Sequence, residues 1–183
     1  LYFVKALNDD KRKCLVQLND VKVVETSGEV VFDVDSEENI RKIQEIDTLN
    51  LGAAEDNSMS WFGKELSGGV VAKAYTFSVS QGQISTDRID ETKIFNTHQE
   101  PVDFEVEAGR TCDVILEFAG IWFAKKAFGS SWNLVQVRIH DEPILDTYPE
   151  GYAFVEWKKN CWTYIKDDEE YWSCSTTCND RGR

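Results

Sequence analysis

Two apolar stretches separated by a short basic connection place the strongest constraint on how this chain folds. Residues 111–124 (TCDVILEFAGIWFA) and residues 131–140 (SWNLVQVRIH) are rich in β-branched and aromatic residues, which favour strands. The sequence between them, KKAFGS, is short and contains a glycine. Consecutive strands joined by a short connection pair antiparallel, so these residues are expected to form a β-hairpin.

Strand patterns also precede this hairpin. Residues 14–25 (CLVQLNDVKVVE) alternate on both sides of Asn19–Asp20, which predicts another hairpin that turns at these two residues. Residues 28–35 (GEVVFDVD) then predict a third strand.

The period of the apolar residues changes after the third strand. Asp35 and Glu38 form a capping-box pattern ahead of isoleucines spaced three residues apart. A helix is therefore expected from about Ser36 to Leu49, and its acidic first turn suits the helix dipole.

The middle of the chain gives weaker patterns. Residues 53–69 have room for a second short helix, and residues 70–80 (VVAKAYTFSVS) predict a strand. Residues 81–101 are polar and predict a loop with room for a short strand at 93–95, and residues 102–109 alternate again.

These patterns predict a mainly β (α+β) fold: an OB-like antiparallel barrel of about seven strands with an inserted helix, or a small β-sandwich. We expect a barrel domain over residues 1–143, with the helical insertion at about 36–66. Residues 144–183 lose the alternation and predict an irregular aromatic and acidic C-terminal extension. The expected core consists of Val23, Val31, Phe32, Ile40, Ile43, Val71, Phe104, Val114, Leu116, Val135, Val137 and Ile139.

Charge and composition limit the function classes. The formal net charge is −13, so the chain cannot coat nucleic acid with its whole surface, and any such binding requires a local patch. No stretch of eighteen apolar residues predicts a membrane span. Five scattered cysteines do not suggest a disulfide framework, which favours an intracellular location.

The hairpin offers such a local patch. Alternation places Trp132, Leu134, Gln136 and Arg138 on one face of the second strand, which is expected to be exposed, and the intervening residues in the core. Exposed rings beside cations suit single-stranded nucleic acid, because bases stack on rings while lysines contact phosphates. The alternative interpretation is a packed Trp122–Trp132 pair beside a solvated turn. The candidate nucleic-acid-binding residues are Lys73, Tyr75, Trp122, Lys125, Lys126, Phe128, Trp132 and Arg138.

The motifs of this region resemble a known family. The hairpin resembles the C-terminal hairpin of the single-stranded DNA-binding-like proteins of nucleocytoplasmic large DNA viruses, of the algal-virus and mimivirus kind. The residues that carry the resemblance are, in order, Gly120, Trp122-Phe123, Lys125-Lys126, Phe128–Trp132 and Val135–Arg138. SMSWFGKELS, at 58–67, resembles the segment that follows the inserted helix in that family.

The resemblance implies an OB-like fold and sequence-tolerant binding of single-stranded DNA, without catalysis, in viral replication, recombination or packaging. It also implies a location in the host nucleus, the cytoplasmic virus factory or the virion. This chain departs from the family in lacking a Tyr-Pro-Pro segment and in having only Arg88 and Lys93 as cations within residues 81–100. The alternative is a virion structural or assembly protein that uses the same fold for protein contacts.

Other chemistry has little support in the sequence. Cys174 and Cys178 are spaced Cys-x3-Cys, unlike the usual zinc knuckle, and no nucleophile accompanies either histidine. We therefore predict no enzyme activity, no metal and no cofactor. The acidic KDDEE at 166–170 suggests either a solvated loop or a tail that recruits partners. Eight aromatic residues between 148 and 172 predict contacts with the domain, with protein partners or with a second copy.

Overall fold

A computed structural model describes residues 2–103, 106–140, 163–166 and 169–172. The chain divides into two compact units, Leu1–Glu142 and Pro143–Arg183. In the second unit, β9 (Thr163–Lys166) and β10 (Glu169–Trp172) form an antiparallel hairpin, which the sequence did not predict. The roles predicted for the aromatic side chains and cysteines of the C-terminal extension fall outside the described residues.

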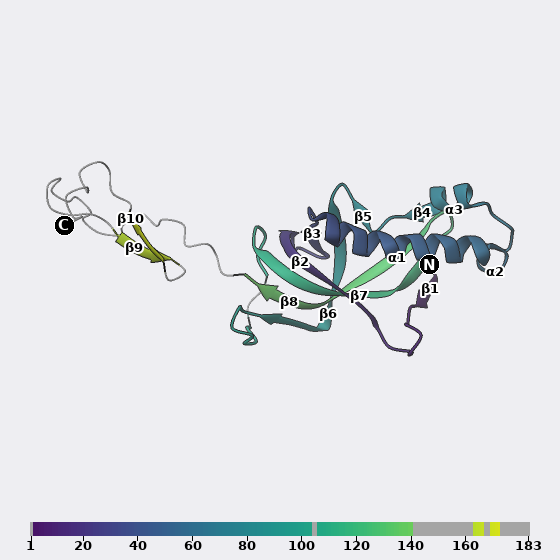
Figure 1. Ribbon diagram of the computed structural model, residues 1–183. Helices are drawn as coiled ribbons and strands as arrows, with labels where there is room; N and C mark the ends of the chain where they lie inside the picture. Colours follow the sequence, from purple (N-terminus) through teal and green to yellow (C-terminus); the bar gives the residue numbers. More distant parts are fainter. Residues whose placement is uncertain (1, 104–105, 141–162, 167–168, 173–183) are drawn as a thin grey trace. The chain divides into compact units, whose positions relative to one another are not determined.

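Five strands of the first unit form a closed circuit (Figure 1). β2 (Cys14–Glu25) pairs antiparallel with β3 (Val30–Asp33), and β3 pairs antiparallel with β6 (Gln83–Phe95). β6 runs parallel to β8 (Phe128–Ile139), which pairs antiparallel with β7 (Thr111–Phe123), and β7 returns to β2. A five-stranded barrel with one non-sequential crossover is the OB-like architecture, so the predicted fold class is confirmed.

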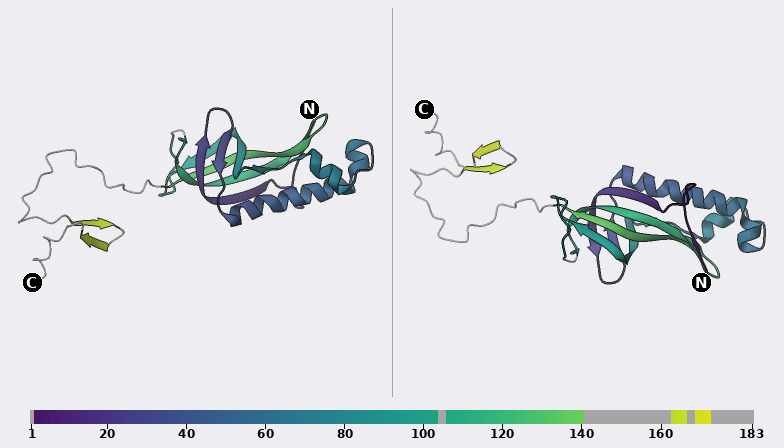
Figure 2. Two further views of the ribbon diagram at one scale, coloured as in Figure 1. Left: turned by 90° about the horizontal axis from the view of Figure 1, so that it is seen from above. Right: turned by 90° about the horizontal axis from the view of Figure 1, so that it is seen from below.

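Three short strands extend this barrel at one end. β1 (Tyr2–Lys5) pairs with the last residues of β7, beyond the part of β7 that β2 covers. β4 (Tyr75–Thr76) pairs with the start of β8, and β5 (Val79–Ser80) pairs with the start of β6. Both views in Figure 2 place the N-terminus beside the turn that joins β7 and β8.

Three helices lie between β3 and β4 in the sequence. α1 (Glu37–Asp56) runs along the barrel and is followed by α2 (Ser58–Phe62) and α3 (Gly68–Ala74). α1 is longer than predicted, because Gly52 continues the helix and Ala54 packs in the core. Within the described residues, no helix is long and apolar enough to cross a membrane.

Residues 14–25 form one strand, so the hairpin predicted at Asn19–Asp20 is wrong. Asp20 has a φ of 54°, and the pairing with β7 shifts between Leu18 and Val21. Both halves of β2 pair with β7, which means that Asp20 produces a bulge within the strand and not a chain reversal.

The assignments for residues 70–101 also need correction. The first part of the strand predicted at 70–80, residues 70–74, belongs to the helix α3, and only the short strands β4 and β5 follow it. The loop predicted at 81–101 is largely β6, whose inward side chains include Ile84, Thr86 and Ile94. The outward residues of β6 are polar, which hides the strand from an analysis based on apolar periodicity.

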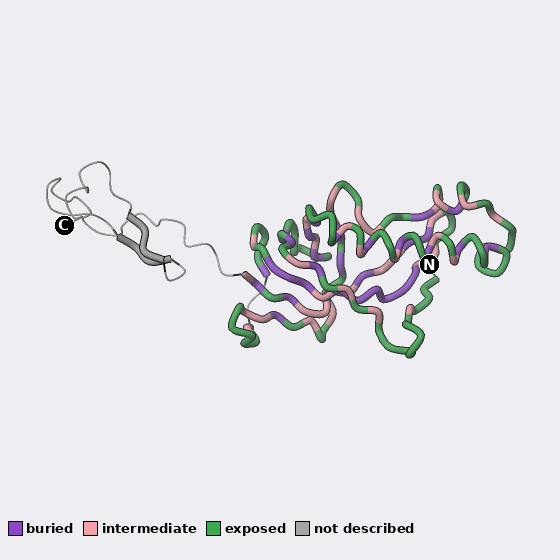
Figure 3. The backbone as a smooth tube through the Cα atoms, viewed as in Figure 1, coloured by how far each residue is buried: buried purple, intermediate pink, exposed green. Residues whose placement is uncertain are grey.

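The core fills the barrel interior and continues under α1 (Figure 3). Val31, Ile40 and Val135 are only partly buried, and Phe104 lies outside the described residues. Pairing between β7 and β8 shifts next to Ile115, which changes the face of β8 that points inward. The predicted core residues that are buried are Val23, Phe32, Ile43, Val71, Val114, Leu116, Val137 and Ile139.

Candidate nucleic-acid interface

The predicted lysines gather at one end of the barrel. Lys125 and Lys126 are exposed in the β7–β8 turn, which Ala124 closes by donating its backbone N–H to the carbonyl of Ala127 at 2.8 Å. Lys73 lies in the last turn of α3, two residues before Tyr75, which pairs with the first residue of β8. Lys73 therefore lies at the same end of the barrel as the turn, although on a helix and not on the predicted strand.

Three of the rings among the predicted nucleic-acid-binding residues are buried. Phe128, Trp132 and Tyr75 are 1%, 3% and 6% exposed, so neither the base stacking predicted for Trp132 and Phe128 nor the contact predicted for Tyr75 fits this structure. The register shift in β8 turns Trp132 inward, where its indole packs against Phe118 with ring centroids 5.6 Å apart. The alternative Trp122–Trp132 pair does not form either, because the residue opposite Trp122 is Gly129.

Trp122 is the predicted ring that remains partly accessible. Its indole Nε1 donates to the carbonyl of Ser130 at 3.2 Å, and its side chain lines a groove on the barrel. This hydrogen bond fixes the position of the ring relative to β8.

Two exposed rings that the site prediction missed lie beside the lysine turn. Trp61 of α2 is 36% exposed and meets Phe123 edge-on at 5.6 Å, and Tyr2 is 67% exposed and lies 6.1 Å from Phe123. Lys64 is exposed and follows Gly63, the residue that caps the end of α2. Trp61 and Lys64 both belong to the SMSWFGKELS segment, whose resemblance to the family could have indicated them as site residues. The name basic end is used below for Tyr2, Trp61, Lys64, Lys73, Lys125 and Lys126.

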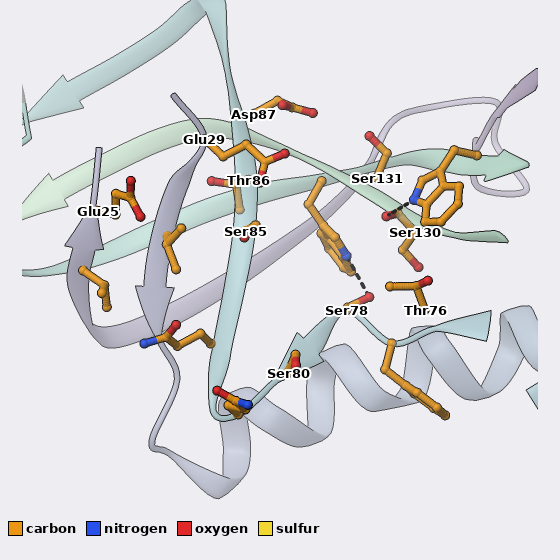
Figure 4. A pocket seen from close by; sticks show the side chains of 17 residues that line it. Glu25, Glu29, Thr76, Ser78, Ser80, Ser85, Thr86, Asp87, Ser130 and Ser131 are labelled. Carbon is orange, nitrogen blue, oxygen red and sulfur yellow. Dashed lines mark hydrogen bonds between the residues drawn. The ribbon is translucent and has the colours of Figure 1, made fainter. Parts of the chain in front are cut away.

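A groove with a volume of about 540 Å³ crosses β3, β6 and β8 next to the basic end (Figure 4). Its charged side chains are Glu25, Glu29 and Asp87, and its exposed ring is Phe77. Figure 4 shows Glu25 and Glu29 on the β2–β3 side and Ser78, Thr76 and Ser130 on the opposite side. The hydroxyl groups that line it belong to Thr76, Ser78, Ser80, Ser85, Thr86, Ser130 and Ser131.

Arg138 does not belong to the basic end. It lies ten residues after Phe128 on β8, a distance of roughly 33 Å along an extended strand. Its Nε donates to Asp113 Oδ2 at 2.9 Å. The prediction that Arg138 joins the lysines at one phosphate site is therefore wrong, because a carboxylate at the other end of the strand already pairs with it.

Asp113 also lies beside His140 and Asp20. His140 Nε2 is 3.0 Å from Asp113 Oδ2, and the backbone N–H of Asp20 donates to Asp113 Oδ1 at 2.9 Å. Candidate ligand atoms of Asp20, Asp113 and His140 lie within 4.8 Å of one another. Because Arg138 and the backbone N–H of Asp20 already donate to Asp113, we interpret this cluster as a structural network and not as a metal site.

The network makes stability depend on pH. Burial alone would raise the pKa of Asp113. The hydrogen bonds from the backbone N–H of Asp20 and from the side chains of His140 and Arg138 outweigh the effect of burial, so this pKa lies below its ordinary value of 3.8. A carboxyl group whose pKa is lower in the folded state stabilises the fold above its unfolded pKa and loses that contribution as the pH falls. We expect Asp113→Asn to lower the urea midpoint at about pH 7 and by a smaller amount at about pH 2, well below the ordinary pKa of 3.8. An equal loss at both pH values would contradict this account.

The fold and site together define an OB-like barrel with a basic aromatic end and an acidic groove. The chain belongs to a family of unknown function (DUF5871), whose model matches residues 19–156. No curated protein matches it.

Among solved structures, the chain is similar to the single-stranded DNA-binding protein from bacteriophage Enc34. The complex with single-stranded DNA is 13% identical, covering 71% of this chain and 89% of that chain, with a TM-score of 0.44. The C-terminal truncation is 13% identical, covering 78% and 98%, with a TM-score of 0.47. A further structure of that protein is 14% identical, covering 80% of this chain and 94% of that chain, with a TM-score of 0.46. The OB-like assignment rests on the strand circuit and not on these similarities.

Proposed function

We propose that this protein binds single-stranded DNA at its basic end, with little preference for base sequence. The observation that carries the proposal is the placement of two exposed rings, Trp61 and Tyr2, beside four lysines at one end of an OB-like barrel. Rings supply about 1–3 kcal/mol for each stacked base, and stacking does not read base edges. The lysines supply the phosphate contacts.

The distribution of charge confines such binding. With a net charge of −13, most of the surface repels a polyanion, and the groove itself carries Glu25, Glu29 and Asp87. DNA would therefore occupy a short site at the basic end. We propose that the protein acts in the replication, recombination or packaging of the DNA of a large virus.

The groove favours a second candidate function, that of a virion structural or assembly protein. A positive, concave and aromatic groove would have suited DNA, but the charged residues that line this groove are all acidic. An acidic groove suits contacts with another protein better than contacts with phosphates.

The test of DNA binding is fluorescence anisotropy of a labelled oligothymidine of about 20 nucleotides over a range of salt concentrations. Lys125→Ala with Lys126→Ala is expected to weaken binding and to reduce the slope of log K against log salt by about 1.4, since each phosphate contact contributes about 0.7 on a single strand. Trp61→Ala is expected to weaken binding about tenfold with an unchanged slope.

A matched control separates local from general charge effects. Lys22 and Lys93 are exposed on β2 and β6, away from the turn, and replacing both by alanine removes the same charge. The control should bind nearly as well as the unaltered protein. No binding by the intact chain at low salt, or equal losses in the two double variants, would overturn the proposal.

A further inference from the structure

The groove lies over a gap in the pairing of the barrel strands. β8 pairs with β4 up to Gly129 and with β6 only from Asn133 onward. β6 pairs with β5 at Gln83 and Ile84 and with β8 only from Asp87 onward. Within the described strands, 130–132 and 85–86 therefore have no strand partner on the edges that border the groove. The carbonyl of Ser130 already accepts from Trp122 Nε1, and the other backbone groups on these edges can hydrogen-bond to an extended chain.

The side chains around this gap favour a positively charged ligand. Glu25, Glu29 and Asp87 are exposed, and none of the residues that line the groove is a lysine or arginine. Phe77 is 50% exposed and Trp122 is partly exposed, so both can offer a ring face to a cationic group. Carboxylates beside aromatic rings recognise guanidinium and ammonium groups and repel phosphates.

The far wall of the groove is fixed before any ligand arrives. Asp47 on α1 accepts hydrogen bonds from the backbone N–H of Ser78 at 3.0 Å and from its hydroxyl at 2.6 Å. Ser78 Oγ also accepts from the indole Nε1 of Trp132 at 2.9 Å. Because these bonds hold the segment between β4 and β5 in place, a ligand would not have to order it.

We propose that the groove binds an extended, lysine- or arginine-containing segment of a partner protein. The segment runs along the open edges of β6 and β8. Its cationic side chains contact Glu25, Glu29 and Asp87, and a further cationic group lies against Phe77. The hydroxyl groups of Ser85 and Ser131 are available to its backbone. This inference does not depend on DNA binding, which uses the lysines of the basic end.

The experiment uses a labelled peptide of about eight residues that alternates arginine and serine, with the full chain titrated in an anisotropy assay. The groove variant, Glu25→Gln with Glu29→Gln and Asp87→Asn, is expected to lose about tenfold in affinity, because three charge contacts are removed together. The matched control is Asp35→Asn with Glu45→Gln and Asp56→Asn, which removes the same charge from exposed positions outside the groove. The control is expected to bind nearly normally.

The outcomes separate this proposal from the DNA-binding one. Lys125→Ala with Lys126→Ala should leave peptide affinity unchanged while it lowers affinity for oligothymidine. Equal loss of peptide binding in the two carboxylate variants would show attraction by net charge alone and would overturn the proposal. If Phe77→Ser lowers oligothymidine binding and leaves peptide binding unchanged, the groove serves DNA, and the proposal is also wrong. A peptide that alternates glutamine and serine should not bind.

Discussion

Replacing Asp47 by alanine is expected to lower the free energy of unfolding by about 3 kcal/mol or more, because it leaves several buried donors without an acceptor. Asp47 is buried on α1 and accepts a hydrogen bond from the hydroxyl of Tyr75 at 2.7 Å. It also accepts the two hydrogen bonds from Ser78 that fix the groove wall. No other carboxyl group in the described residues joins α1 to both β4 and the segment that follows it.

The loss of Asp47 would leave more donors in this network than acceptors. Burial raises the pKa of the Tyr75 phenol well above its ordinary value, so this hydroxyl keeps its proton and still needs an acceptor. Asn50 already donates to the oxygen of Tyr75 at 3.1 Å, and Ser130 Oγ lies 2.7 Å from that oxygen. Even if the Tyr75 hydroxyl then donates to Ser130 Oγ, the backbone N–H and the hydroxyl of Ser78 still lose the carboxylate that accepts from them.

Thermal and urea unfolding of Asp47→Ala would measure this loss, which corresponds to a fall of about 10 °C in Tm. Glu45→Ala, an exposed position on the same helix, serves as the control and should change Tm little. A fall in Tm no larger than that of the control would show that water replaces the carboxyl group without cost. In that case the network would not be what fixes the groove.

The sequence predicts best the strands that are apolar on both faces. β7 is covered over most of its length, and its partner β8 carries inward residues at nearly every second position, so their hairpin is clear from composition alone. β6 was missed because it forms a wall of the groove and carries serine, aspartate and glutamate on its outer face. A strand that exposes polar side chains for a functional reason lacks the apolar signal used to find strands.

The exposure of the two turn lysines follows from the sequence, whereas the exposure of the rings does not. Lys125 and Lys126 follow from the turn, since a turn between two strands lies at the surface whatever the register. The exposure of Trp132 depends on the register of β8, and one bulge moves a side chain to the other face of a strand. Trp61 was missed because its exposure depends on how α2 packs against Phe123, a contact distant in sequence.

Gly120 is expected to be the position on β7 least tolerant of any side chain. Its φ is +155°, and a Cβ atom there would lie 2.0 Å from the carbonyl oxygen of Val4 and 2.8 Å from the ring of Phe3. β1 runs antiparallel beside β7 at this point, with Lys5 paired to Gly120. Gly120→Ala therefore combines an unfavourable backbone conformation with a clash against backbone atoms, and we expect it to cost about 2–4 kcal/mol.

A thermodynamic cycle would assign this cost to its cause. In a chain that lacks residues 1–5, the clash with β1 is absent, so Gly120→Ala should cost only the backbone term of about 1–2 kcal/mol. Gly52→Ala is the control: Gly52 lies inside α1 with open space around it, and alanine there should be neutral or stabilising. Urea unfolding of the four chains in the cycle gives the coupling energy. If Gly120→Ala costs the same with and without residues 1–5, the packing of β1 across Gly120 is not what excludes a side chain.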